Sequence, residues 1–180
     1  LWRNRLRELL DNAPDTLDRM LLNYDPPQGN PEFLEAVADC LNKAYGWQLS
    51  AKNIGVTSGG QTALFFLFNL LAGPAAQSDR PAGKILLPLV PEYIGYANQG
   101  IAHDMFVACL PVIEELEDHD FKYHVDFDAV EAVLQADTIA AICVSRPTNP
   151  TGNVLTDREI ARLSGLAAAH GVPLIIDNAY

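Results

Sequence analysis

Polar side chains follow two apolar segments near the end of this 180-residue sequence. The segment 140–145 runs into a turn at 145–152 with the sequence SRPTNPTG, and the segment 174–177 ends in Asp177. Both segments are predicted to be parallel strands, and ligands collect beyond the carboxyl ends of such strands. A carboxylate at the end of an apolar strand is costly unless it has a cationic or donor partner, so Asp177 is a candidate ligand group. The alternative is that Asp177 caps a helix.

Asn149 and Arg146 lie in the first of these turns. The Asn149 amide can donate hydrogen bonds to an anionic oxygen, and the two prolines around it stiffen the loop. Arg146 is a cation at a strand end, where it could pair with Asp177, a phosphate or a substrate carboxylate. By itself, Asn-Pro-Thr-Gly is also a favourable turn sequence.

Two earlier turns carry residues that suit a planar, phosphorylated ligand. Gly59, Gly60 and Gln61 stand between a predicted strand at 54–57 and an apolar helix, so their backbone amides could bind a phosphate at the helix N-terminus. Tight strand-to-helix turns also use glycine for steric reasons alone. The turn after the strand 85–88 contains Tyr93, whose ring could stack on a cofactor or simply pack the loop.

The predicted elements alternate between strand and helix, which is typical of a parallel sheet covered by helices. Asn30 and Asp126 are predicted N-caps, and residues 156–159 have the pattern of a capping box. The sequence therefore predicts an α/β fold, a three-layer αβα arrangement with a mostly parallel sheet. Strands are expected at 54–57, 85–88, 106–110, 140–145 and 174–177, helices at 31–45, 62–72, 126–134 and 156–171 with the second of them buried, and connections at 74–83 and 114–124.

The composition argues against several classes of protein. The formal net charge of −11 disfavours nucleic acid and anionic membranes as partners, because only the short run Arg3, Arg5 and Arg7 could neutralise phosphates. The 3 cysteines form no C-x-x-C pair and lie in apolar segments, which is typical of buried thiols in a reducing cytoplasm. The histidines lack metal-ligand spacing. We expect a soluble, cytoplasmic protein without a membrane segment.

Taken together and in order, these turns resemble the class I/II aminotransferases of fold type I, which use pyridoxal 5′-phosphate. The resemblance rests on the segments 24–29, 58–62, 91–93, 149–152 and 177–180. Three longer segments, 90–96, 121–127 and 143–154, resemble more narrowly the valine-pyruvate aminotransferases within that family.

The resemblance implies a role for each candidate residue. Backbone amides would bind the coenzyme phosphate, an aromatic ring would stack on the pyridine ring, and a carboxylate would keep the ring nitrogen protonated. A further tyrosine would reach the phosphate of a neighbouring subunit, so a homodimer is implied. The residues are Gly59, Gly60 and Gln61 for the phosphate, Tyr93 for stacking, Asn149 and Tyr180 for the phenolic oxygen, Asp177 for the nitrogen, Tyr24 for the neighbouring subunit, and Asn149 and Arg146 for the substrate.

The implied reaction transfers an amino group from L-valine or a similar amino acid to pyruvate, giving a 2-oxo acid and L-alanine. The lysine that forms a Schiff base with the coenzyme would lie beyond Tyr180, so residues 1–180 are expected to be part of the large domain and inactive alone. Other reactions of the same coenzyme, such as β-elimination or decarboxylation, remain alternatives, as does a non-catalytic ligand-sensing domain.

Two structural details also follow from the resemblance. Cis peptide bonds are expected before Pro91 and Pro150, in the loops that aim Tyr93 and Asn149. Two strands from outside the sequence would lie between the strands 54–57 and 140–145, which would leave the strand 54–57 detached from the rest of the sheet and a strand-wide gap beside 140–145.

Overall fold

The computed structural model describes residues 1–73 and 83–180, so the connection expected at 74–83 lies outside the described residues except for Gly83. The chain forms two compact units, Leu1–Thr57 and Ser58–Tyr180. Among the helices of the described part, none is both long and apolar enough to cross a membrane.

The first unit consists of helices and connecting loops. Its helices are α1 (Trp2–Asn12), α2 (Pro14–Leu22), α3 (Pro31–Tyr45) and the short 3₁₀ helix η1 (Ala51–Asn53). The predicted N-cap of α3 is confirmed, because Asn30 Oδ1 accepts a hydrogen bond from the Phe33 amide at 3.1 Å. Gly46 ends the helix in the left-handed conformation.

The predicted strand at 54–57 is wrong. These residues form no strand, although the expected separation of this segment from the sheet is confirmed. Their backbone groups bond to the nearby loop instead. The Val56 amide donates to the carbonyl of Gln28 at 2.9 Å. The Gln28 side-chain amide donates in turn to the carbonyls of Ala51 and Ile54 at 2.7 and 2.6 Å.

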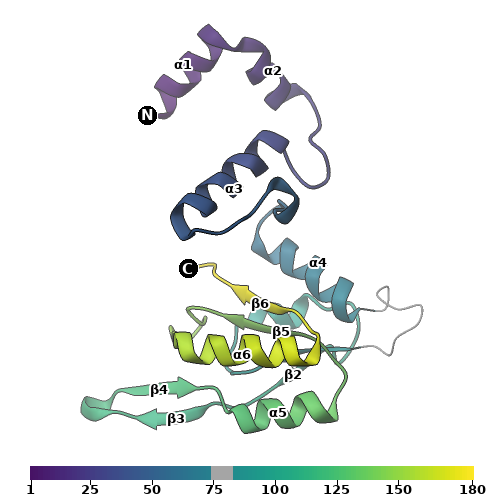
Figure 1. Ribbon diagram of the computed structural model, residues 1–180, viewed down its shortest axis with the longest axis vertical. Helices are drawn as coiled ribbons and strands as arrows, with labels where there is room; N and C mark the ends of the chain where they lie inside the picture. Colours follow the sequence, from purple (N-terminus) through teal and green to yellow (C-terminus); the bar gives the residue numbers. More distant parts are fainter. Residues whose placement is uncertain (74–82) are drawn as a thin grey trace. The chain divides into compact units, whose positions relative to one another are not determined.

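The second unit contains a parallel sheet with helices on both faces, as predicted (Figure 1). The strand order is β2-β1-β5-β6, and each neighbouring pair is parallel. The strands are β1 (Lys84–Leu87), β2 (Phe106–Ala108), β5 (Ile139–Ser145) and β6 (Leu174–Asp177), the helices are α4 (Gly60–Ala72), α5 (Phe127–Ala136) and α6 (Asp157–His170), and a 3₁₀ helix, η3, spans Ile94–Asn98.

Alternation along the central strands divides the core into two layers. Ile142 and Val144 of β5 pack with α5 and α6, whereas Ala141 and Cys143 pack with α4 on the opposite face. Each of these four side chains is 0% exposed, so both faces of β5 are covered.

Two expectations about this unit are corrected. The strand β5 has a neighbour on each side, so there is no gap beside it within the described sheet, and β6 is the edge strand instead. Helix α4 buries only one face: Phe68 is 0% exposed, whereas Phe66 and Leu70 are 51% and 67% exposed. The uniform apolarity of this helix therefore does not mean that it is buried all round.

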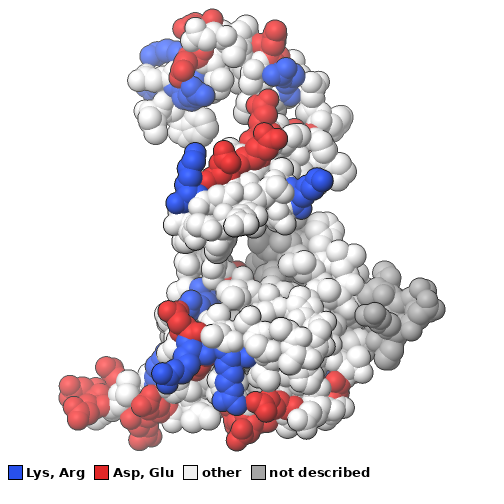
Figure 2. Space-filling view, viewed as in Figure 1, with Lys and Arg blue, Asp and Glu red and all other residues white. Residues whose placement is uncertain are grey.

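A hairpin replaces the connection that was expected at 114–124. Strands β3 (Val112–Glu115) and β4 (Phe121–His124) pair antiparallel around the 3₁₀ turn η4 (Glu117–His119). Residues Asp118 and His119 are left-handed, which closes the turn. Figure 2 shows the acidic side chains of 114–120 gathered at this hairpin.

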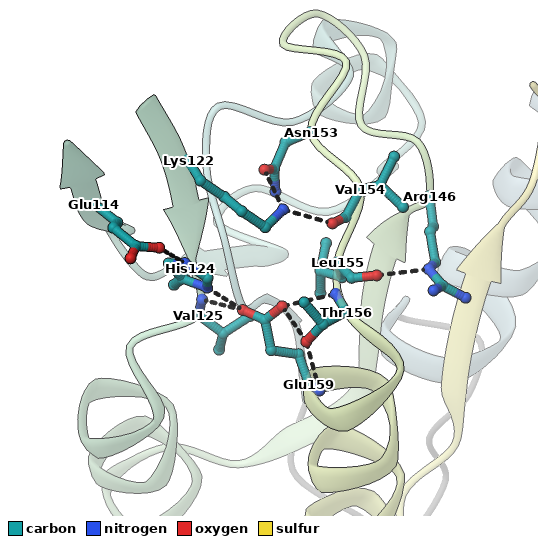
Figure 3. Close-up of polar contacts among 10 residues, drawn as sticks. All are labelled: Glu114, Lys122, His124, Val125, Arg146, Asn153, Val154, Leu155, Thr156 and Glu159. Atoms are coloured by element: carbon teal, nitrogen blue, oxygen red, sulfur yellow. Dashed lines mark hydrogen bonds and ion pairs between the residues drawn. The ribbon is translucent and has the colours of Figure 1, made fainter. Parts of the chain in front are cut away.

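The base of the hairpin is attached to the start of α6 (Figure 3). His124 Nε2 lies 2.8 Å from Glu114 Oε2, and His124 Nδ1 lies 3.2 Å from Glu159 Oε1. The buried Glu159 carboxylate also accepts hydrogen bonds from the Val125 amide and from Thr156 in the predicted capping box. Lys122 Nζ donates to the Val154 carbonyl at 2.7 Å.

This attachment predicts a pH dependence. The hydrogen bond to Glu114 raises the pKa of His124 above 6.5 despite partial burial, and Glu159 adds to that effect. Burial alone would raise the pKa of Glu159, but hydrogen bonds from Thr156, Val125 and His124 lower it below 4.5. The histidine's contribution is therefore complete below pH 6.5 and lost as the pH rises through its raised pKa. The contribution of Glu159 is complete above pH 4.5 and lost as the pH falls through its lowered pKa.

We therefore expect the hairpin amides to be best protected from hydrogen exchange between pH 4.5 and 6.5. After correction for the intrinsic exchange rate, His124→Asn should remove the loss of protection above this window. The matched variant His103→Asn changes an exposed histidine outside the hairpin and should keep the wild-type profile. An unchanged profile in His124→Asn would contradict this account.

Candidate functional site

A pocket of about 220 Å³ opens at the carboxyl edge of the sheet, where the ends of β5 and β6 meet the start of α4. The pairing of Ser145 with Asp177 places the ends of the two strands side by side. The lining residues come from four segments that are distant in the sequence. They are Gly60, Gln61, Leu64, Tyr93, Ser145, Pro147, Asn149, Asp177, Ala179 and Tyr180.

Asp177 is the last residue of β6, and its side chain is partly buried in the pocket wall. Its carboxylate accepts a hydrogen bond from Tyr96 Oη at 2.8 Å. Its carbonyl accepts one from the Arg146 amide at 2.9 Å, which fixes the backbone at the strand end. A donor partner was expected for the Asp177 carboxylate, and the Tyr96 hydroxyl is one such donor.

The start of α4 provides backbone amides on another side of the pocket. Gly59 precedes the helix with φ +95°, a conformation that side chains rarely adopt. A Cβ added at Gly60 would meet no atom within 4 Å. The chain itself therefore has room for a side chain at this position, and the space in front of the backbone is open. This helix N-terminus can therefore approach an anionic group closely.

The Tyr93 ring is held in place at the pocket by three contacts. Gln61 Nε2 donates to Tyr93 Oη at 2.7 Å, and the ring meets that of Tyr96 edge-on at 5.5 Å. A Cβ at Gly95 would collide with the Tyr93 ring, so a residue with a side chain does not fit there. Tyr93 is thus positioned as an aromatic wall of the pocket.

The turn after β5 presents Asn149 at the pocket. Asn149 Nδ2 lies 3.3 Å from Tyr180 Oη, so these two residues lie side by side. The predicted cis bonds Val90-Pro91 and Asn149-Pro150 are confirmed, and a third, Arg146-Pro147, was not predicted.

Three candidate residues are not among those that line this pocket. Gly59 directly precedes the lining residue Gly60, whereas Arg146 and Tyr24 are engaged elsewhere or belong to the other unit. Arg146 Nε donates to the Leu155 carbonyl at 2.8 Å (Figure 3). Its Nη2 pairs with Asp157 at 2.6 Å. Its side chain thus ties the turn to α6 and does not pair with Asp177. Tyr24 belongs to the first unit, where its side chain is fully exposed, and its contact with a neighbouring subunit stays a prediction.

Sequence reasoning assigned no role to Glu92 and Tyr96, which do not line the pocket, or to Ser145, which does. The Glu92 carboxylate accepts hydrogen bonds from the Ser145 amide at 2.8 Å and the Ser145 hydroxyl at 2.6 Å. Burial raises the pKa of Glu92, the bonds from Ser145 and Tyr93 partly oppose this, and the nearby Asp177 adds to it. Tyr96 belongs to the segment 90–96, which contributes to the family resemblance but carries no predicted role for this residue. A polar residue inside an otherwise apolar strand end, such as Ser145, was the available clue.

Larger hollows of about 460 and 490 Å³ lie along the hairpin. Their walls consist largely of exposed hairpin side chains and lack the convergence of strand ends and a helix N-terminus. We therefore assign the site to the smaller pocket at the sheet edge. Within the described residues, no group of three or more His, Cys, Asp or Glu side chains is arranged to hold a metal ion.

None of the four lysines is among the residues that line this pocket. Lys84 pairs with Asp137 at 3.1 Å, beside the amino end of β5, and Lys122 is bound to the 153–154 loop. Lys43 and Lys52 belong to the first unit. The lining residues therefore include no amine.

The relatives of this chain are aminotransferases. It is 51% identical over 179 residues to the valine-pyruvate aminotransferase of Escherichia coli K12, a match that covers 99% of this chain and 41% of that enzyme. The chain thus spans about two fifths of the length of this relative. It is also 30% identical to a probable aspartate/prephenate aminotransferase of Thermus aquaticus over 87% of this chain and 37% of that protein.

Solved structures agree with these relatives. A putative amino-acid aminotransferase from Psychrobacter arcticum superposes with a TM-score of 0.83 at 46% identity, covering 94% of this chain and 40% of that one. The valine-pyruvate aminotransferase of Salmonella typhimurium gives 0.78 at 45% identity, covering 99% and 42%. The family model for aminotransferase class I and II matches residues 2–180. The chain therefore belongs to the class I and II aminotransferase family.

Proposed function

We propose that this chain forms the coenzyme-binding part of an enzyme that transfers an amino group from L-valine, or a similar amino acid, to pyruvate. The products are a 2-oxo acid and L-alanine. The observation that carries the proposal is the convergence of four sequence-distant segments on one pocket. The 51% identity to an E. coli enzyme of this name supports the choice of substrates.

The pocket residues fit pyridoxal 5′-phosphate, the coenzyme typical of the family. An added Cβ at Gly59 or Gly60 would meet no atom of the chain within 4 Å, so this turn leaves room for the phosphate. The Tyr93 ring suits a flat pyridine ring. Asn149 and Tyr180 offer an amide and a hydroxyl side by side for the phenolic oxygen. When bound, the coenzyme supplies an electron sink for the bond-breaking step at the substrate α-carbon.

The chain's own groups bind and orient. Asp177 favours a proton on the ring nitrogen, because a nearby carboxylate stabilises a cation. The Tyr93 ring would hold the pyridine ring of the coenzyme in one plane. Gln61 Nε2 donates to Tyr93 Oη at 2.7 Å and so fixes the position of the Tyr93 ring. Asn149 is also proposed to bind the substrate carboxylate, whereas Arg146 is already paired with Asp157 and Leu155 and is left out of this role.

The domain organisation, the localisation and the oligomeric state of the enzyme are proposed from the family resemblance. We propose that residues 1–180 are part of the large domain of a cytoplasmic enzyme that acts as a homodimer, with Tyr24 directed to the coenzyme phosphate of the partner. The family resemblance supports this arrangement. Cross-linking and sedimentation of the intact enzyme test the dimer, and Tyr24→Phe tests the contact through coenzyme affinity.

We expect the 180-residue chain alone to bind pyridoxal phosphate reversibly and to show no exchange between valine and pyruvate. The reason is that no lysine lines the pocket to react with the coenzyme aldehyde. The chain should be incubated with coenzyme, reduced with borohydride and mapped by mass spectrometry. Specific labelling of Lys43, Lys52, Lys84 or Lys122 together with turnover would overturn this expectation.

The intact protein encoded by the complete gene provides the test of the reaction itself. Valine and pyruvate should give alanine and the matching 2-oxo acid in equal amounts. Release of ammonia or carbon dioxide instead would favour β-elimination or decarboxylation. Tight coenzyme binding without any turnover would favour a ligand-sensing domain.

A further inference from the structure

We infer that Glu92 and Tyr96 are positioning residues, which fix the Asp177 carboxylate and the Tyr93 ring from behind the pocket wall. Neither residue lines the pocket. The inference rests on the proposed function, because it concerns how the coenzyme site is held in shape.

Tyr96 is suited to hold one carboxylate oxygen in a fixed direction. Its side chain is 1% exposed, and its ring contacts those of Phe68 and Tyr93 edge-on at 5.6 and 5.5 Å. The phenol is therefore immobilised by packing before it donates to Asp177 Oδ2 at 2.8 Å. Burial and the bond to Asp177 raise the pKa of Tyr96, so the hydroxyl keeps its proton and remains a donor.

Glu92 connects the Tyr93 loop to the end of β5. Its carboxylate accepts from the Ser145 amide, the Ser145 hydroxyl and the Tyr93 amide at 2.8, 2.6 and 3.1 Å. A carboxylate can accept all three bonds, whereas a glutamine amide must present one end that is a donor only. Glu92 thus fixes the backbone that carries the Tyr93 ring.

The contacts of Glu92 and Tyr96 connect the 92–96 loop, β5 and β6 to one another around the site. Glu92 joins the loop to Ser145 on β5, Ser145 pairs with Asp177 on β6, and Asp177 accepts from Tyr96 of the same loop. Three segments that carry pocket residues are therefore linked without a bound molecule. Loss of either link should let Asp177 or Tyr93 move relative to the other.

The test is a double-mutant cycle on the affinity of the chain for pyridoxal phosphate. Tyr96→Phe should weaken binding about tenfold, as expected for a hydrogen bond to a charged group. In the Asp177→Asn background the same change should have less than a twofold effect, because Tyr96 acts through Asp177. Glu92→Gln should also weaken binding about tenfold. Tyr123→Phe is the matched control on β4 and should leave the affinity unchanged.

A second measurement does not need the coenzyme. The carboxyl ¹³C resonance of Asp177 in the chain without coenzyme should shift in Tyr96→Phe and stay in place in Tyr123→Phe. If this shift occurs but neither the wild type nor any variant binds the coenzyme, the positioning role stands and the proposed coenzyme function fails. Coenzyme binding that is equal in the wild type, Tyr96→Phe and Glu92→Gln would overturn the positioning role alone.

Discussion

Replacing Asp177 by asparagine is expected to weaken binding of pyridoxal phosphate to the chain by about 30-fold or more, the effect of removing one partner of a buried charge pair. Asparagine keeps the shape of the side chain and can still accept from Tyr96, whose hydroxyl lies 2.8 Å from the carboxylate. What it removes is the negative charge that stabilises a protonated ring nitrogen. Titration of the coenzyme absorbance with protein measures the affinity directly.

The matched control for this prediction is Asp137→Asn. Asp137 is also a partly buried aspartate with a hydrogen-bonded partner, Lys84, but it precedes β5 and so lies away from the pocket. This variant should bind coenzyme like the wild type. Equal affinities for the wild type and Asp177→Asn would remove the central electrostatic argument for the coenzyme site.

Elements with local signals were predicted best. The side chains of Asn30, Asp126 and Thr156 each accept a hydrogen bond from a backbone amide in the first turn of the helix that follows. Because the donor lies only three residues along the chain, the helix start can be predicted from the local sequence. Likewise, Asp177 and Asn149 could be placed together because the carboxyl ends of parallel strands share one edge of a sheet.

Features that depend on distant partners could not be predicted. Arg146 was expected in the site, but its direction depends on Asp157 and the Leu155 carbonyl, which only the folded turn brings near. The roles of Glu92 and Tyr96 depend on residues 53 and 81 positions away. The segment 54–57 has the composition of a strand, but it pairs with the Gln28 loop and not with a sheet.

The apolar core and the polar site meet at one side chain. Phe68 on α4 is 0% exposed and contacts the rings of Tyr96 at 5.6 Å and Phe106 at 5.3 Å, both edge-on. It therefore fills the core between α4 and the sheet and also supports the phenol that holds Asp177. A cavity at this position should affect both stability and coenzyme binding.

We expect Phe68→Ala to lower the free energy of unfolding of the second unit by about 3–5 kcal/mol, since it leaves a cavity that packed neighbours fill only in part. Both tryptophans lie in the first unit, so hydrogen exchange of the β1 and β5 amides is the appropriate measurement. Phe66→Ala removes the same side chain from the same helix at a position that is 51% exposed, and it should cost less than about 1 kcal/mol. Under conditions where the variant remains folded, Phe68→Ala should also weaken coenzyme binding, because Tyr96 loses its support. If the two variants were equally stable, the packing of α4 against the sheet through Phe68 would be refuted.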